Sequence, residues 1–324
     1  MDLTLQYLEK NNMDLNKKIF VAGHRGLVGS AFVRKLKQIG ANCIITKTRA
    51  ELDLCNQEAT KDFFAKEKPA YVILAAAKVG GIIANSTYPA DFIYENMMIE
   101  ANVIDAAYKN NCEKFLFLGS SCIYPKLCPQ PIKEDYLLTS ALEESNEAYA
   151  LAKIAGIMLC KSYRKQYSFN AISAMPGNLY GPGDNFHPEN SHVLPAMLLR
   201  MHDAKEKGLD SVTIWGTGKV LREFIHVDDV VDASIFLMNN YTGEKHVNIG
   251  SNEEVSIMEL ATLVASIVGY KGEIFTDPNK PDGTPRKVVD TSYINNLGWK
   301  AKISLKEGIK NTYKWFLEQD NIRK

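Results

Sequence analysis

Tyr149 and Lys153, four residues apart, are the pair in this sequence best suited to proton chemistry. On a helix, residues i and i+4 share one face, so the ammonium group can approach the phenol. A neighbouring cation favours the phenolate, so we expect Lys153 to lower the pKa of Tyr149. Such a tyrosine can exchange a proton with an alcohol or sugar oxygen near neutral pH. Most pairs at this spacing are solvated helix neighbours, so a functional role for Tyr149 and Lys153 depends on the other motifs.

Three glycines, Gly23, Gly26 and Gly29, lie between an apolar segment and a helical pattern. Glycine permits a tight turn and close approach of the backbone to a pyrophosphate, and the following helix N-terminus offers amides to the phosphates. A purely structural turn is the alternative. The strand–turn–helix context favours a dinucleotide site.

The end of the next apolar segment indicates which dinucleotide is bound. An NAD site usually presents a carboxylate there to the adenosine ribose. This chain has Arg49 there, and Arg25 lies inside the glycine turn. Two guanidinium groups can bind a 2′-phosphate, so we predict NADP (as NADPH). Asp53 has two readings, a contact to the adenine amino group or a helix N-cap.

Ser120 follows the apolar segment 114–119. Ligands of parallel sheets bind beyond the carboxyl ends of the strands, so Ser120 should face the reactive part of the cofactor. There its hydroxyl could hydrogen-bond a carbonyl oxygen that Tyr149 protonates. A helix cap or turn is the plainer interpretation of a serine at this position.

Apolar segments alternate with helical patterns in the first half of the chain, which predicts an α/β fold with a doubly wound parallel sheet, a Rossmann domain. The expected strands are 18–22, 43–46, 71–77, 114–119 and 170–175, and the expected helices reach 39 and cover 57–67, 89–110 and about 146–165. Beyond Pro176 the pattern is mixed. It predicts loops at 176–183 and 277–287, helices at 192–206 and 256–268, and short strands at 212–215 and 272–276.

The domain boundaries follow from this change of pattern. We expect residues 1–16 to be an N-terminal extension and 17–182 to form the NADP-binding Rossmann domain, with a return segment at about 223–250. Residues 183–222 and 251–324 should form a smaller mixed α/β domain that binds the substrate.

Composition excludes several classes of function. Thirty-eight basic residues balance thirty-eight acidic ones, so no overall charge favours nucleic acid or a membrane surface. No apolar run is long enough to span a bilayer. The six cysteines lack CxxC spacing, so neither a metal site nor a disulfide framework is expected, and a cytoplasmic location is predicted.

The glycine triplet, Ser120 and the Tyr149–Lys153 pair together resemble the extended short-chain dehydrogenase/reductase family. Longer segments narrow the resemblance to the nucleotide-sugar enzymes of that family that epimerise and then reduce a GDP-linked keto sugar. It covers about residues 17–318 and is carried by GHRGLVGSA, FLGSSCIYPK, NLYGPGDNFHPENSHVLPA, REFIHVDD and KPDGTPRK.

The resemblance implies conversion of GDP-4-keto-6-deoxy-D-mannose to GDP-L-fucose by epimerisation at C3 and C5 and hydride reduction at C4. It assigns the epimerisation to Cys122 and His192, whose ordinary pKa values bracket neutral pH. Taken alone, Cys122 reads as a buried hydrophobe and His192 as a helix-cap residue. The catalytic set is then Ser120, Cys122, Tyr149, Lys153 and His192.

The resemblance also implies the binding residues. Cofactor contacts are expected at Gly23, Arg25, Gly26, Leu27, Val28, Gly29, Arg49, Asp53, Leu118, Gly119, Ser121, Lys153, Pro176, Asn178, Leu179 and His192. Substrate contacts are expected at Asn178, Arg200, Trp215, Arg222 and Asp282. Family members pair through the helices near 89–110 and 146–165, so a homodimer is expected.

Three other functions are compatible with parts of the pattern. A nucleotide-sugar 4,6-dehydratase commonly has Asp-Glu where this chain has Ser121-Cys122. A 4-epimerase with tightly held NAD does not need Cys122 and His192, and Arg25 and Arg49 disfavour NAD. A regulator that senses NADP without turnover can dispense with the Ser, Tyr and Lys set.

Overall fold

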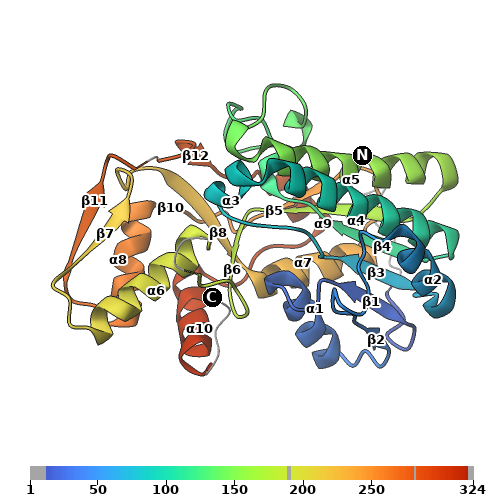
Figure 1. The fold of residues 1–324 in the computed structure, drawn as a ribbon, viewed down its shortest axis with the longest axis horizontal. Helices are drawn as coiled ribbons and strands as arrows, with labels where there is room; N and C mark the ends of the chain where they lie inside the picture. The colour runs from blue at the N-terminus through green and yellow to red at the C-terminus, as the bar shows by residue number, and fades with distance from the viewer. Residues whose placement is uncertain (1–11, 188–190, 281, 320–324) are drawn as a thin grey trace.

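The computed structural model describes residues 12–187, 191–280 and 282–319. A larger lobe surrounds a parallel sheet, and a smaller lobe lies beside it at the carboxyl end of the strands, as Figure 1 shows. No helix in these ranges combines the length and apolarity needed to cross a membrane.

A six-stranded parallel sheet forms the centre of the larger lobe. Its spatial order is β2-β1-β3-β4-β5-β9. The strands are β1 (Ile19–Ala22), β2 (Ile44–Ile45), β3 (Tyr71–Leu74), β4 (Lys114–Leu118), β5 (Ala171–Pro176) and β9 (Val247–Ile249). The chain runs outward from β1 to β2 and then returns to β3 on the other side of β1. The strand order therefore reverses between β1 and β3, which is where doubly wound sheets bind ligands. The predicted α/β Rossmann fold is confirmed.

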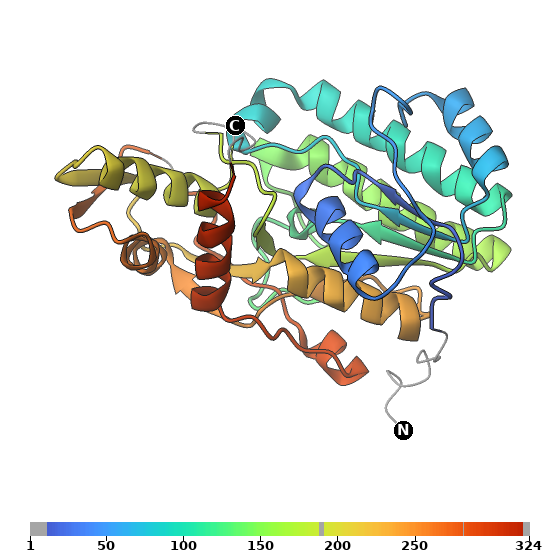
Figure 2. The same cartoon turned by 90° about the horizontal axis from the view of Figure 1, so that it is seen from below.

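Helices cover both faces of this sheet because its strands are apolar on both faces. Ile19 and Val21 point into one core and Phe20 and Ala22 into the other, as the alternation of a strand requires. One face is covered by α2 (Gln57–Glu67), α4 (Pro89–Lys109) and α5 (Glu147–Tyr167). The other face is covered by α1 (Leu27–Gln38), α7 (Val227–Asn240) and α9 (Ser292–Leu297). The two layers are seen from a second side in Figure 2.

The smaller lobe combines two small sheets with three helices. Its four-stranded sheet consists of β6 (Asn178–Tyr180), β8 (Leu221–His226), β10 (Glu254–Ser256) and β12 (Arg286–Lys287). The parallel pair β7 (Ser211–Trp215) and β11 (Glu273–Asp277) lies with α6 (Val193–Glu206), α8 (Ile257–Val268) and α10 (Leu305–Leu317). Phe186, Leu198, Leu260 and Ile309 are buried in the core of this lobe.

Several local expectations were wrong. The predicted loops 176–183 and 277–287 contain β6 and β12, which form only because each finds β8 as a partner. The third strand ends at Leu74, three residues before the predicted end. Four short elements were not predicted from the sequence: α3 (Ile82–Thr87) and the 3₁₀ turns η2 (Ser121–Ile123), η3 (Glu134–Tyr136) and η4 (Glu144–Asn146).

Two segments connect the lobes differently from the expected boundaries. The return to the first sheet is made by α7 and β9, whereas β8 pairs in the second sheet. The end of the expected extension 1–16 is docked on the larger lobe: Met13 is buried in its core, and the Asp14 amide donates to the Tyr71 hydroxyl at 3.0 Å. Residues 1–11 lie outside the described ranges.

Candidate functional site

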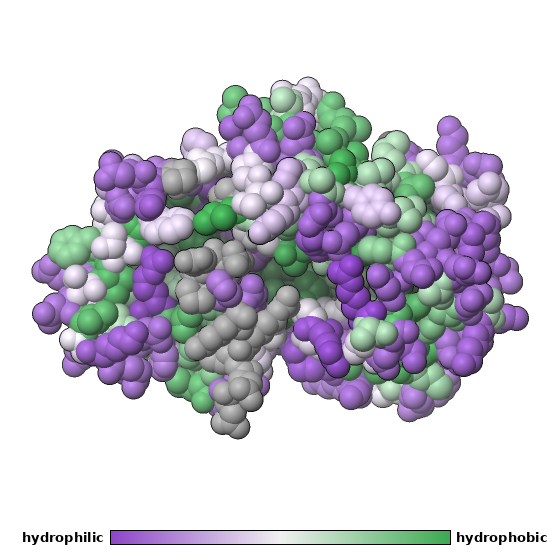
Figure 3. Space-filling view, in the orientation of Figure 1, coloured by the Kyte–Doolittle hydropathy of each residue, from purple (hydrophilic) through white to green (hydrophobic). Residues whose placement is uncertain are grey.

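A cleft of about 1530 Å³ separates the two lobes at the carboxyl end of the parallel strands. In the space-filling view a hollow opens between the lobes (Figure 3). Most of the predicted site residues line this cleft. Four do not: Leu118, Lys153, Arg200 and Trp215.

The glycine turn between β1 and α1 forms one wall. Gly23 adopts φ +85°, a conformation that L side chains rarely adopt, and a Cβ there would lie 2.7 Å from the Ala76 amide nitrogen. A Cβ on Gly29 would overlap the Gly23 carbonyl group. No side chain caps α1, whose N-cap is Gly26, so the first amides of the helix are open to a phosphate group. The turn can hold the pyrophosphate of a dinucleotide.

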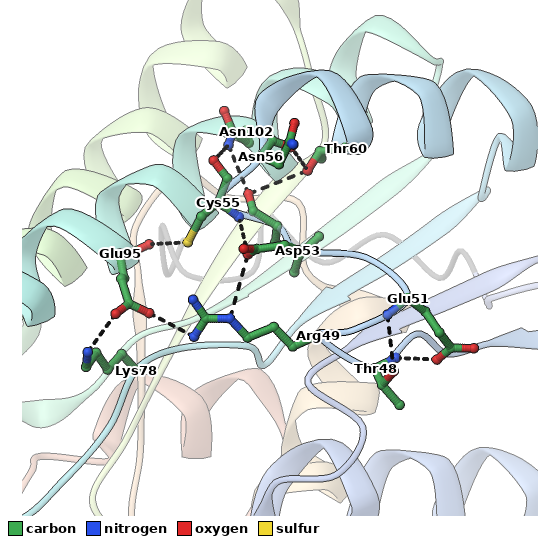
Figure 4. Close-up of polar contacts among 11 residues, drawn as sticks. Thr48, Arg49, Glu51, Asp53, Cys55, Asn56, Thr60, Lys78, Glu95 and Asn102 are labelled. Carbon is green, nitrogen blue, oxygen red and sulfur yellow. Dashed lines mark hydrogen bonds and ion pairs between the residues drawn. The ribbon is translucent and has the colours of Figure 1, made fainter.

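Charged residues from three segments form a network at the end of the cleft that follows β2 (Figure 4). Glu95 of α4 lies 3.0 Å from Arg49 Nη1 and 2.6 Å from Lys78 Nζ. Asp53 Oδ1 lies 3.8 Å from Arg49 Nε. Arg49 is therefore held by two carboxylates rather than being a free surface charge.

The N-cap reading of Asp53 was wrong. Asn56 caps α2, because its side chain accepts the Ala59 amide. The Asp53 carboxylate instead accepts the Cys55 amide at 3.0 Å and pairs with Arg49.

Ser120, Cys122 and Tyr149 meet where β4 ends. Ser120 is the N-cap of η2, and its hydroxyl accepts the Cys122 amide at 3.4 Å. The cap interpretation is correct, and the same residue still lines the cleft. Burial raises the pKa of the Cys122 thiol, which Lys287 and Ser120 partly offset.

The expected effect of Lys153 on Tyr149 was wrong. Burial raises the pKa of Tyr149 well above its usual value, and Cys122 and Glu100 raise it further. The Lys153 ammonium lies 5.9 Å from the centre of the Tyr149 ring, but it pairs with Glu100 of α4 at 3.1 Å. A carboxylate on another helix therefore balances the charge that was expected to act on the phenol.

His192 occupies the N-cap position of α6 without making a capping hydrogen bond. Its side chain is exposed in the cleft. The cleft walls shield the imidazole from water, which lowers its pKa, and the Lys287 ammonium lowers it further. Cys122, His192 and Lys287 all line the cleft, and the Lys287 ammonium lowers the pKa of both the thiol and the imidazole.

Lys287 on β12 is a cleft residue that was not predicted from the sequence. It lines the cleft, and burial lowers its pKa while Cys122 opposes that effect. Arg222 also lines the cleft, and its Nη2 lies 3.5 Å from the Asp282 carbonyl oxygen. Lys287 follows a segment rich in proline and glycine and is not part of a spaced motif that would predict a catalytic or binding role. Its position in the cleft could therefore be found only from the fold.

The other predicted substrate residues are engaged within the smaller lobe. Arg200 Nη1 donates to the Thr213 carbonyl oxygen at 2.7 Å. The Asp282 carboxylate accepts the Thr217 amide and hydroxyl at 2.7 and 2.8 Å. Trp215 is 51% exposed at the end of β7.

This fold and cleft define an oxidoreductase-type Rossmann protein with a serine and a tyrosine in the cleft and a buried lysine beside the tyrosine. The chain matches the NAD dependent epimerase/dehydratase family over residues 19–250 and belongs to that family. Its sequence is 60% identical to GDP-L-fucose synthase 1 from Arabidopsis thaliana, over 94% of this chain and 94% of that protein.

Two solved structures with NADP bound share the fold. The GDP-L-fucose synthetase from Naegleria fowleri is 28% identical, with a TM-score of 0.92 over 98% of each chain. The GDP-mannoheptose C4 reductase MlghC from Campylobacter jejuni is 43% identical, with a TM-score of 0.87 over 94% of this chain and 100% of that one.

Proposed function

We propose that this protein converts GDP-4-keto-6-deoxy-D-mannose to GDP-L-fucose with NADPH. The observation that carries the proposal is the presence of a thiol and an imidazole, Cys122 and His192, in the cleft that also contains Ser120 and Tyr149. A reductase needs no such second acid–base pair, whereas an epimerase does. The 60% identity to a GDP-L-fucose synthase supports the same substrate.

The cleft residues fit NADPH. The uncapped start of α1 suits its pyrophosphate, and the buried His24 Nδ1 in the same turn has no hydrogen-bond partner among the residues that the structure describes. Arg25 and Arg49 supply positive charge for the 2′-phosphate. When bound, NADPH supplies the hydride that C4 accepts.

Each reactive residue has a defined task in the proposed mechanism. Ser120 and Tyr149 hold the C4 carbonyl oxygen, which stabilises the enolate that forms when C3 or C5 loses a proton. Cys122 and His192 remove and return these protons on opposite faces of the sugar. Because its pKa is raised, Tyr149 stays protonated near neutral pH and can deliver its proton to O4 during reduction.

The GDP portion is proposed to lie against the smaller lobe. Arg222 and Lys287 bring two cations to the cleft for the diphosphate. The remaining proposed contacts are Asn178, Trp215, Asp282 and Arg200. Arg200 and Trp215 lie outside the cleft lining, so the substrate can contact them only if the lobes or the side chains move.

Absorbance at 340 nm tests the proposal when the protein is mixed with NADPH and GDP-4-keto-6-deoxy-D-mannose. Stoichiometric NADPH consumption with GDP-L-fucose as the chromatographic product is expected. No consumption would exclude the proposal, and so would a dehydrated product or one with inverted C4 and unchanged redox state.

Reduction of a GDP-keto sugar at C4 without epimerisation is a second candidate. It is favoured by the 43% identity to the C4 reductase MlghC. The two candidates differ in the product, because a simple reductase would leave C3 and C5 in their original configuration. Cys122 and His192 favour the first candidate.

We further propose that two copies pair through α4 and α5. Tyr94 and Met97 on α4 and Met158 on α5 are exposed by 64%, 45% and 43%, and they lie on helices that pack together. Burying such side chains between two copies would stabilise a homodimer. Light scattering tests this, and a monomeric mass at micromolar concentration would contradict it.

We propose a Rossmann domain of 17–182 with the return segment 223–250, and a substrate domain from the remaining residues up to 324. The structure modifies these bounds at three elements: β6 and β8 pair in the sheet of the smaller lobe, and α9 packs on the larger lobe. We propose a cytoplasmic location, which is supported by six free cysteines. Cell fractionation tests it.

A further inference from the structure

Glu100 is a buried carboxylate that the proposed mechanism does not use. It lies on α4, and its side chain is 1% exposed. One oxygen lies 3.1 Å from the Lys153 ammonium, whose side chain is 2% exposed. A buried charge is costly unless it is paired, so the two groups depend on each other.

The surrounding helices are shaped to admit this pair. Gly156 on α5 faces Glu100, and a Cβ there would lie 2.8 Å from Glu100 Oε2 and would overlap the Phe117 ring. Lys153 Nζ lies 4.8 Å from the centre of that ring and donates to the Leu118 carbonyl oxygen at 3.1 Å. Lys153 is therefore fixed from three sides beneath the end of β4.

We propose that Glu100 is a positioning residue for proton transfer at Tyr149: its carboxylate holds the Lys153 ammonium in place and balances its charge. This inference deepens the proposed function, since it concerns the same tyrosine. Glu100 acts through Lys153 and touches neither substrate nor cofactor.

The charges around the phenol determine the direction of the effect. Two groups near Tyr149, Cys122 of η2 and Glu100 of α4, act on its pKa, and the Lys153 ammonium of α5 lies 5.9 Å from the centre of its ring. The thiol and the carboxylate raise its pKa, and a cation lowers it. Burial raises the pKa of Glu100, and Lys153 and the Gly156 amide partly offset this rise. Replacing Glu100 by a neutral residue leaves the ammonium unopposed, so Tyr149 should ionise at lower pH.

Tyrosine NMR measures this ionisation without any turnover. Protein labelled with ¹³Cζ-tyrosine is titrated, and the Tyr149 signal is assigned by its loss in Tyr149→Phe. In Glu100→Gln we expect the midpoint to fall by about 1 pH unit or more relative to the wild type. Asp105→Asn is the matched control, because Asp105 is also on α4, contacts Tyr163 of α5 at 2.9 Å and lies outside the cleft. It should leave the Tyr149 signal unchanged.

The reverse reaction supplies a second readout. When GDP-L-fucose is oxidised, C4 gives its hydride to NADP⁺, and the O4 proton passes to the Tyr149 phenolate. The rate therefore rises with pH as Tyr149 ionises. Glu100→Gln should move this rise to lower pH, and Glu100→Asp, which keeps the charge, should move it back toward the wild type.

Coincident Tyr149 titrations in the wild type and Glu100→Gln would overturn the inference, as would a pH profile that shifts equally in Glu100→Asp. Circular dichroism and thermal melts establish that each variant is folded. Gly156→Ala offers a variant that keeps both charges but displaces Glu100, and it should also shift the titration. If the wild type fails to oxidise GDP-L-fucose, the proposed function fails while the NMR titration still decides the role of Glu100.

Discussion

Replacing Arg49 with alanine should weaken the binding of NADPH and leave the binding of NADH nearly unchanged. In the network of Figure 4 the Arg49 guanidinium is held at 3.0 Å by Glu95 and at 3.8 Å by Asp53. This pairing keeps the cation at the end of the cleft that follows β2, the proposed adenosine site, where a 2′-phosphate but not a 2′-hydroxyl would gain from it.

The structure limits the size of the effect. A hydrogen bond to a charged group contributes about 1.5–3 kcal/mol. The Arg49 side chain is 69% exposed, and the 2′-phosphate must compete with Glu95 for it, so the lower value applies. A loss of about 1.5 kcal/mol corresponds to a Kd for NADPH that is roughly tenfold higher.

Fluorescence titration of the protein with NADPH and with NADH measures both Kd values. Arg34→Ala is the matched control, because Arg34 is an exposed arginine that pairs with Asp228 at 3.2 Å outside the cleft lining. It should alter neither Kd. An equal loss for NADPH and NADH in Arg49→Ala, or no loss at all, would refute the assignment of Arg49 to the 2′-phosphate.

Three further outcomes are expected. Cys122→Ser should slow solvent deuterium exchange at C3 and C5 by about 10²–10⁴-fold and spare the oxidation of GDP-L-fucose; wild-type exchange would contradict its role. Lys287→Met should raise KM for the GDP-sugar about tenfold or more while the Kd of NADPH stays the same, because burial gives its charge little screening. Burial lowers the pKa of His246 from 6.5 to about 4, so the unfolded chain binds the proton first as pH falls, and stability is lost below pH 6.5. The free energy of unfolding should therefore be lower at pH 5 than at pH 7.5, and His246 should account for about 2 kcal/mol of this difference. We expect His246→Gln to remove that contribution and His202→Gln, the control, to retain it.

The sequence was sufficient for the fold because the strands of the larger sheet are apolar on both faces. Segments such as Ile19–Ala22 and Tyr71–Leu74 are buried along their whole length, so they read as continuous apolar runs. The two-residue strand β12 and the three-residue strand β6 have no such signal. They are defined only by pairing with β8, a partner far away in the sequence.

The site shows the same division between local and distant effects. The glycine turn and the Tyr149–Lys153 spacing are local patterns, and the sequence revealed both. The partners that set their charge, Glu100 for Lys153 and Glu95 for Arg49, come from α4 and cannot be read from spacing. The pKa of Tyr149 was predicted in the wrong direction because burial of the phenol raises it, and Cys122 and Glu100 raise it further.

In the proposed reaction, one cleft both epimerises and reduces the sugar. Running the reaction with NADPH in D₂O and examining the product by NMR shows whether it does. We expect GDP-L-fucose that carries solvent deuterium at C3 and C5 and a hydrogen from NADPH at C4. A reduced product with protium at both C3 and C5 would instead identify the protein as a simple C4 reductase.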